Sequence, residues 1–295
     1  MASKKYLLLT GLVTLLSASG VYAQESNSGM YRGGGYDFSD TSLIPEKRMA
    51  QQRDFMNGQY DFPSKPRNQW EVGITAGLYN VSGDVRSKSL FVNQSVAPLK
   101  TTGWGIHVRK AWGYVLSTRL QYIHGSASGY NHQGSKGYWG HDNPWMDAGY
   151  GLTNGSTIKN VYYNYWTRTN ELSLQVIAAL NNLKFHRARN KVSYYALAGV
   201  GVLTYHTMVN MKDASNNNYD FSTIDDGLTG TAWDQRKEKN SRLKAMFDKT
   251  YETEAERHEN RNTWNKVGTL RAAATVGGGA QIRLGKKLSL QIEDK

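Results

Sequence analysis

The chain has 295 residues, a formal net charge of +12 and no cysteine, which excludes disulfide frameworks, thiolate metal sites and cysteine nucleophiles. Its 8 Trp, 19 Tyr, 7 Phe and 30 Gly stand against only 5 Pro. This composition favours β structure with aromatic belts over a helical enzyme core.

The first 23 residues have the pattern of a secretory signal peptide. Lys4 and Lys5 precede an apolar run from Leu7 to Leu16, and Val21-Tyr22-Ala23 places small residues at a cleavage site. The run is about half of the roughly 20 residues that a membrane-spanning helix requires. We therefore expect residues 1–23 to be removed on export.

Residues 24–69 form a second region, with glycines, prolines and a balanced charge. We interpret it as a mostly irregular, exported lead segment. One short helix is predicted from Glu46 to Met56, because Pro45 precedes it and its first turn is acidic.

From Trp70 onward, apolar and polar side chains alternate with a period of two. Between Trp70 and Tyr79, the apolar face carries Val72 and Ile74, and the other face carries small or polar residues. The stretch from Val192 to His206 is more uniformly apolar, so its two faces are not distinguished. Counting these two, the pattern predicts seven strands, and the other five lie at 103–109, 116–122, 171–180, 270–284 and 288–293.

The connections between these strands alternate in length. The long ones span 80–101, 125–161 and 207–266, and short turns follow the second, fourth and sixth strands. Outer-membrane barrels show this asymmetry, with short periplasmic turns and long extracellular loops. We therefore predict an all-β fold for residues 70–295, an antiparallel transmembrane β-barrel. Because such barrels have an even number of strands, we expect eight, with the last one truncated in this sequence; the alternative is that part of the lead segment supplies the missing strand.

Three stretches resemble the membrane barrel of the outer-membrane protein A (OmpA) family: Asp61 to Ile74, Leu78 to Val85 and Gly105 to Tyr114. The resemblance covers residues 61–124 well, and 169–205 and 267–295 more loosely. It implies an eight-stranded structural barrel in the outer membrane of a Gram-negative-type envelope. Family members typically continue into a periplasmic domain that binds peptidoglycan, and this sequence does not contain that region, so no binding residue is carried over.

An eight-stranded barrel has an interior just wide enough for side chains. Charged groups that face it must pair, because an uncompensated buried charge costs several kcal/mol. A gated pore selective for anions is the alternative interpretation of the same residues. The predicted interior charge network consists of Glu71, His107, Arg109, Arg119, Glu171, Arg271, Arg283 and Glu293.

The long connections carry the candidates for recognition. Those in 125–161 are aromatic: Tyr130, Tyr138, Trp139 and Trp145. They could bind glycans or envelope proteins, or pack on one another as a folded cap. In the third long connection, Leu243, Met246, Phe247 and Tyr251 fall at helical spacing and predict a short amphipathic helix, either on the barrel rim or as a docking site.

Catalytic, metal and cofactor sites are not expected. His132 and His141 lack the spacing of metal ligands, and His124, Ser126 and Asp142 have no spacing that makes them a triad. The expected partners are outer-membrane lipid and lipopolysaccharide, peptidoglycan through the missing domain, and envelope proteins, with no nucleic acid. Surface adhesion through the loops and a soluble carbohydrate-binding β module remain as alternatives.

Overall fold

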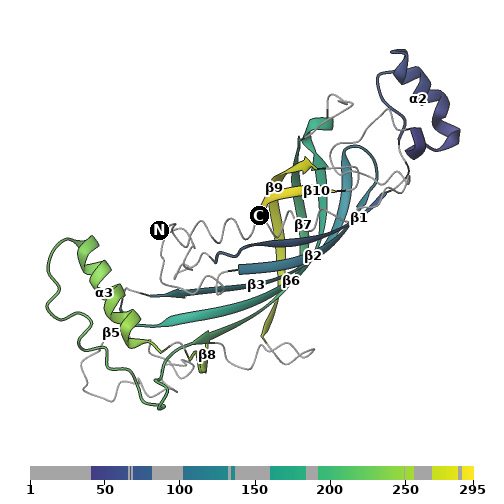
Figure 1. Cartoon of the computed structure of the whole chain (residues 1–295). Coiled ribbons are helices and arrows are strands. Elements are labelled where there is room, and N and C mark those ends of the chain that lie inside the picture. Colours follow the sequence, from purple (N-terminus) through teal and green to yellow (C-terminus); the bar gives the residue numbers. More distant parts are fainter. Residues whose placement is uncertain are drawn as a thin grey trace.

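Figure 1 shows a computed structural model of the chain. The residues that it describes are 41–65, 67, 69–81, 102–131, 134–136, 160–183, 192–248, 250–255, 268–284 and 288–295. The predicted signal peptide and the first part of the lead segment lie outside these residues. Within them, none of the helices combines the length and the apolar character needed to cross a membrane.

One antiparallel sheet dominates the fold and curls into a half-barrel (Figure 1). Each strand pairs with its neighbours in chain order, so the sheet is built entirely from up-and-down connections. The seven strands are β1 (Gln69–Leu78), β2 (Thr102–Ala111), β3 (Leu116–Tyr130), β6 (Asn164–Ala179), β7 (Val192–Val209), β9 (Thr269–Arg283) and β10 (Ser289–Asp294). All seven predicted strands are therefore confirmed.

Three short pieces accompany the main sheet. β8 (Thr253–Glu254) pairs with the end of β7, and β4 (Ser135–Lys136) pairs with β5 (Asn160–Val161) in a separate ladder. A 3-10 turn, η5 (Leu180–Asn182), follows β6. These pieces do not change the order of the main sheet.

The period-two pattern explains why these segments become strands with one face inside. In β2, His107 and Arg109 are buried, whereas Trp104, Ile106 and Val108 are exposed on the outer face. The register continues this division across the sheet, because Arg109 pairs with Arg119 of β3, and Arg119 pairs with Gln175 of β6. Polar side chains therefore gather inside the curl, and apolar ones cover its outside.

Three strands extend further than the sequence pattern indicated. β3, β6 and β7 contain 15, 16 and 18 residues, which is more than the 9–11 or so that a tilted strand needs to cross a bilayer. Toward the long connections, these strands lose the alternation of apolar and polar side chains. Backbone pairing still continues there, as between β3 and β6 from Ser126↔Arg168 to Tyr130↔Asn164. The ranges predicted from the alternation are therefore too short for these three strands.

The sheet has two open edges, β1 and β10, which do not pair with each other among the described residues. Because every neighbour is antiparallel, seven strands leave these two edges running in the same direction. The edges nevertheless face each other across the interior, since Gln291 Nε2 donates to Glu71 Oε1 at 2.9 Å. The eighth strand remains a prediction.

The lead segment packs under the turn between β2 and β3. Its helical part consists of η1 (Thr41–Leu43), η2 (Glu46–Arg48) and α2 (Met49–Met56), which confirms the predicted helix. Ile44 and Tyr114 are buried together in one cluster, and the Tyr114 hydroxyl donates to the backbone carbonyl of Ser64. The chain before β1 is thus fastened to the end of the sheet that carries the short turns.

At the opposite end, the third long connection contains α3 (Ala232–Met246). The predicted helix from Leu243 to Tyr251 was misplaced, because Phe247 already has extended backbone and Tyr251 has a φ of 52°. Leu243, Met246 and Phe247 do pack together, but around the end of a helix that lies mostly before them.

Candidate functional site

The most extensive polar network lies inside the curled sheet and centres on Arg119. This arginine of β3 is 2 % exposed and contacts Glu293 of β10, with Nη1 to Oε2 at 2.9 Å and Nη2 to Oε1 at 2.8 Å. Its Nε and Nη2 also donate to Gln175 Oε1 at 2.8 and 2.6 Å. The guanidinium therefore has a bidentate carboxylate partner and an amide partner, which together compensate its burial.

Glu293 gathers two further donors. The Tyr195 hydroxyl of β7 donates to Oε2 at 2.7 Å, and Lys295 Nζ lies 3.2 Å from Oε1. Lys295 also contacts Gln121, whose Oε1 in turn accepts from Gln175 Nε2 at 3.2 Å. This network, from Arg119 to Lys295, joins four strands across the interior.

A second group surrounds Arg109 of β2. Its Nε donates to Ser117 Oγ at 2.8 Å, and its Nη1 donates to Gln281 Oε1 at 3.3 Å. Nη1 also lies 3.7 Å from Glu71 Oε2, an ion pair between the first two strands. Because Glu71 also accepts a hydrogen bond from Gln291, this second group links the two edge strands, β1 and β10, across the interior.

His107 fits against β1 only because its partner there is a glycine. The register pairs Gly73 with His107, and a Cβ atom on Gly73 would lie 2.3 Å from His107 Cε1. Neither ring nitrogen of His107 has a hydrogen-bond partner among the described residues. The imidazole therefore fills space between strands and does not join the ion pairs.

Of the remaining predicted members of the charge network, none with a described side chain forms an ion pair with these groups. Glu171 accepts from the Thr275 hydroxyl at 3.0 Å and has no arginine partner among the described residues. Arg271 is exposed near the outer end of β9, without an ion pair in the part of the chain that is described. Arg283 occupies a position in β9 opposite Ser289, and its side chain lies outside the described residues.

Sequence reasoning missed Tyr195 and Lys295. Tyr195 belongs to the strand whose two faces were not distinguished, and only the pairing Tyr195↔Gly279 places it inside. In the sequence, Gly279 is the feature that could have indicated a bulky inward side chain on the neighbouring strand, because a Cβ atom there would lie 2.8 Å from the Tyr195 hydroxyl. Lys295 was overlooked as an interior group, although it continues the inward alternation of Gln291 and Glu293.

Aromatic side chains mark both ends of the outer apolar face. Toward the short turns, Lys110 Nζ lies 4.3 Å from the ring centroid of Trp112 and 5.0 Å from that of Trp70. Toward the long connections, the Trp104 and Tyr122 rings are 5.9 Å apart. The apolar surface between these two sets is therefore bounded on each side by rings and polar groups.

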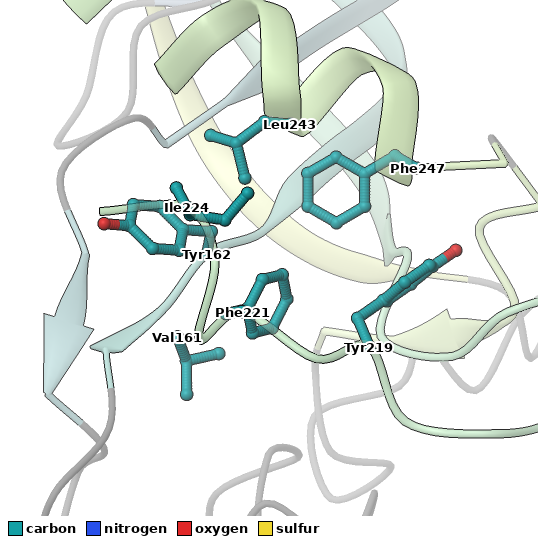
Figure 2. Close-up of a cluster of buried hydrophobic side chains, with 7 residues drawn as sticks. All are labelled: Val161, Tyr162, Tyr219, Phe221, Ile224, Leu243 and Phe247. Carbon is teal, nitrogen blue, oxygen red and sulfur yellow. The ribbon is translucent and has the colours of Figure 1, made fainter. Parts of the chain in front are cut away.

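The end of the sheet that carries the long connections, here called the outer end, has a small hydrophobic core of its own, shown in Figure 2. Tyr162, Ile224 and Leu243 are fully buried in it, and the Tyr219 and Phe247 rings meet edge to face at 5.3 Å. The complete cluster is Val161, Tyr162, Tyr219, Phe221, Ile224, Leu243 and Phe247. The third long connection thus folds as a cap anchored on the segment before β6.

Polar contacts brace the same cap. The Tyr162 hydroxyl donates to Asp225 Oδ2 at 2.7 Å, and Arg242 Nη1 reaches the carbonyls of Thr223 and Asp226 at 2.8 and 2.7 Å. Burial alone would raise the pKa of Asp248, but hydrogen bonds from Thr250, Tyr219 and Asn210 hold that pKa below its usual range. The connection is therefore held by specific contacts on both sides of α3.

Most of the aromatic residues predicted for recognition lie outside the described part of the chain. Tyr138, Trp139 and Trp145 lie outside the described residues, as do His132, His141 and Asp142. Tyr130 ends β3, and its side chain also lies outside the described part. Among the described residues, no group of three or more His, Asp or Glu side chains could hold a metal ion.

Comparison with known proteins gives no match to a family model, to a curated protein or to a solved structure. The class that the fold defines is an all-β protein with a curled antiparallel sheet, apolar outside and charged inside.

Proposed function

We propose that this protein is a structural β-barrel of the outer membrane, whose sheet crosses the bilayer and whose interior is closed by paired charges. The observation that carries the proposal is the inversion of polarity across one sheet. Ile74 is 89 % exposed on the outer face, whereas Arg119 and Gln175 are buried inside. A water-soluble sheet would gain from the opposite arrangement, because exposed apolar surface is costly in water.

The dimensions support a membrane location. The ten residues of β2 rise about 33 Å along the strand, and a tilt of about 40° reduces this to about 25 Å along the membrane normal. The apolar band of known outer-membrane barrels has about this height and is flanked by aromatic girdles. Trp112 and Trp104 lie near the two ends of this span.

The paired interior favours a structural role over conduction. Arg109 and Arg119 are each held by several partners on facing strands, so opening a path would separate ion pairs in a confined space. The alternative function is a gated pore lined by these arginines. Planar-bilayer recordings distinguish the two, because a structural barrel gives no steady current at ordinary voltages.

The resemblance to the OmpA family extends this proposal to anchoring of the outer membrane. In that case, a peptidoglycan-binding domain outside the present sequence would connect the barrel to the cell wall. The lead segment, fastened under the β2–β3 turn by Tyr114 and Ser64, would lie on the same periplasmic side. Binding of the full-length protein to purified peptidoglycan sacculi tests this part separately.

A second candidate function is partner docking at the outer end. The folded cap favours it, because the cap holds α3 with Trp233 71 % exposed. A large exposed aromatic on an ordered helix is typical of a binding surface. Loss of cell-surface adhesion in a Trp233→Ala variant, with unchanged barrel folding, would support docking over a purely structural role.

Heat-modifiable migration on gels tests the membrane barrel itself. Protein extracted from outer membranes and left unheated should migrate differently from the boiled sample, because a folded barrel stays compact in detergent. A single band under both conditions, together with recovery in the soluble fraction, would contradict the proposal.

A further inference from the structure

We infer that the outer face of β3, β6 and β7 holds a binding site for a phosphate group of an outer-leaflet glycolipid, with Arg168 as its central residue. The inference rests on the proposed membrane location and adds a specific lipid ligand to it. Four observations carry it: the position of Arg168, its stacking, its histidine neighbours, and its donors, which make no side-chain hydrogen bond among the described residues.

The position follows from the register. On the outer face of β6, the apolar residue Leu172 is followed by Asn170 and then by Arg168, toward the end with the long connections. Each step of two residues along a tilted strand rises about 5 Å. Arg168 therefore projects about 10 Å above Leu172, the last aliphatic residue of this face, where the headgroup layer of the outer leaflet would lie.

Among the described residues, Arg168 is held in place by a ring contact and makes no side-chain hydrogen bond. Its Cζ lies 3.9 Å from the ring centroid of Trp166, a cation–π contact on the same face of the strand. Stacking uses the flat side of a guanidinium and leaves its in-plane N–H groups free, and these match the geometry of phosphate oxygens. No described carboxylate lies within ion-pair distance of Arg168, and the side chain is exposed.

Two histidines lie on the same face. His206 of β7 stands directly opposite Arg168, at a distance that brings Cβ atoms to about 5 Å. His124 lies one register step below, where its Nδ1 is 2.8 Å from Asn170 Oδ1. Because that amide oxygen can only accept, Nδ1 is the donor in this contact, which fixes the orientation of the His124 ring.

The neighbouring polar groups favour an anion over a cation. Ser126, opposite Arg168 on β3, adds a hydroxyl, and the Asn170 amide already donates to Thr204 Oγ1 at 3.4 Å. Glu254 is the described carboxylate near this surface; it pairs with Met208, two strands across from Arg168. A phosphate at Arg168 would therefore meet donors from three strands.

The experiment compares lipid preference in vesicles. The full chain is folded into phosphatidylcholine vesicles that contain either a phosphorylated glycolipid (lipid A) or the same glycolipid without its phosphates, and bound lipid is measured after extraction in mild detergent. We expect about tenfold more retention of the phosphorylated form. Arg168→Gln, alone or with His206→Gln, should abolish this preference.

Arg236→Gln is the matched control, because Arg236 also lies over a tryptophan, with Cζ 6.0 Å from the Trp233 ring, but on the outer cap. It should retain the preference. Equal retention of both glycolipids by the folded wild-type protein would overturn the inference, as would full competition by inorganic phosphate at millimolar concentration, which would indicate a soluble-anion site. Failure of the chain to fold into any vesicle would instead contradict the proposed membrane location.

Discussion

At the scale of single residues, the interior is specified by contacts that tolerate little change. Gly73 and His107 illustrate a steric constraint, and Arg119 and Glu293 illustrate an electrostatic one. Both pairs lie on the inward face, and each joins residues from different strands. Two variants therefore test the interior directly.

The first variant is Gly73→Ala. The new methyl group would meet the His107 ring at 2.3 Å, so the ring or β1 must shift, and we expect a loss of about 1–3 kcal/mol in the free energy of unfolding. Urea titration, followed by the heat-modifiable band, measures this loss. Gly77→Ala is the control, because nothing lies within 4 Å of its added Cβ.

The steric origin has its own test in the double variant Gly73→Ala/His107→Ala. Removing the ring creates room for the methyl group, so the double variant should be less destabilised than the sum of the two single variants. Simple additivity would contradict the contact between Gly73 and His107.

The second variant is Glu293→Gln, which leaves Arg119 buried without its charged partner. We expect a destabilisation of about 3 kcal/mol, because breaking a buried ion pair leaves an uncompensated charge. Urea unfolding of E293Q, R119Q and the double variant measures the coupling between the two side chains. An exposed glutamate, as in Glu46→Gln, should change stability by less than about 0.5 kcal/mol. Additive effects in E293Q and R119Q would contradict a direct pair.

The sequence predicted which residues face inward better than which residues meet. Arg119 and Glu293 were both expected inside, but their contact joins β3 to β10 and depends on how tightly the sheet curls. Local alternation contains no information on that curvature. Arg271 illustrates the same limit, since its inward position near the outer end leaves it exposed.

At the scale of elements, hydrophobic alternation located six of the seven strands, and a uniformly apolar run located β7, but the ends of β3, β6 and β7 were missed. The pattern is produced by contact with two different environments, and it fades where β3, β6 and β7 continue beyond the apolar face. The start of α3 follows a different rule. Thr231 and Asp234 form a reciprocal capping box, a pattern of two residues three positions apart that is present in the sequence.

This cap gives α3 a pH dependence. Hydrogen bonds from the Thr231 side chain and backbone hold the pKa of Asp234 below its ordinary value of 3.8. Because the folded-state pKa is the lower one, the stabilisation is complete above 3.8 and is lost as the pH falls through the folded value. NMR chemical shifts of the first turn should therefore lose helical character only as the pH falls below 3.8.

Asp234→Asn provides the comparison for this titration, because the amide cannot ionise. Its first-turn shifts should be independent of pH over the same range. A first turn that titrates equally in the wild type and in D234N would contradict the assignment to Asp234.

At the scale of the whole molecule, we propose that one face of the curled sheet contacts lipid and that the other encloses paired charges. The absence of cysteine makes single-cysteine labelling straightforward. In β6, Leu172, Leu174 and Val176 are exposed on the outer face, and Ser173 and Gln175 are buried inside. The two sets alternate along five consecutive positions.

The most direct measurement places an environment-sensitive fluorophore at each position from 172 to 176, in vesicles with brominated acyl chains. We expect strong quenching at Leu172, Leu174 and Val176 and weak quenching at Ser173 and Gln175, so that quenching alternates with a period of two. Uniformly weak quenching along β6, with every label accessible to aqueous iodide, would contradict a membrane-spanning sheet.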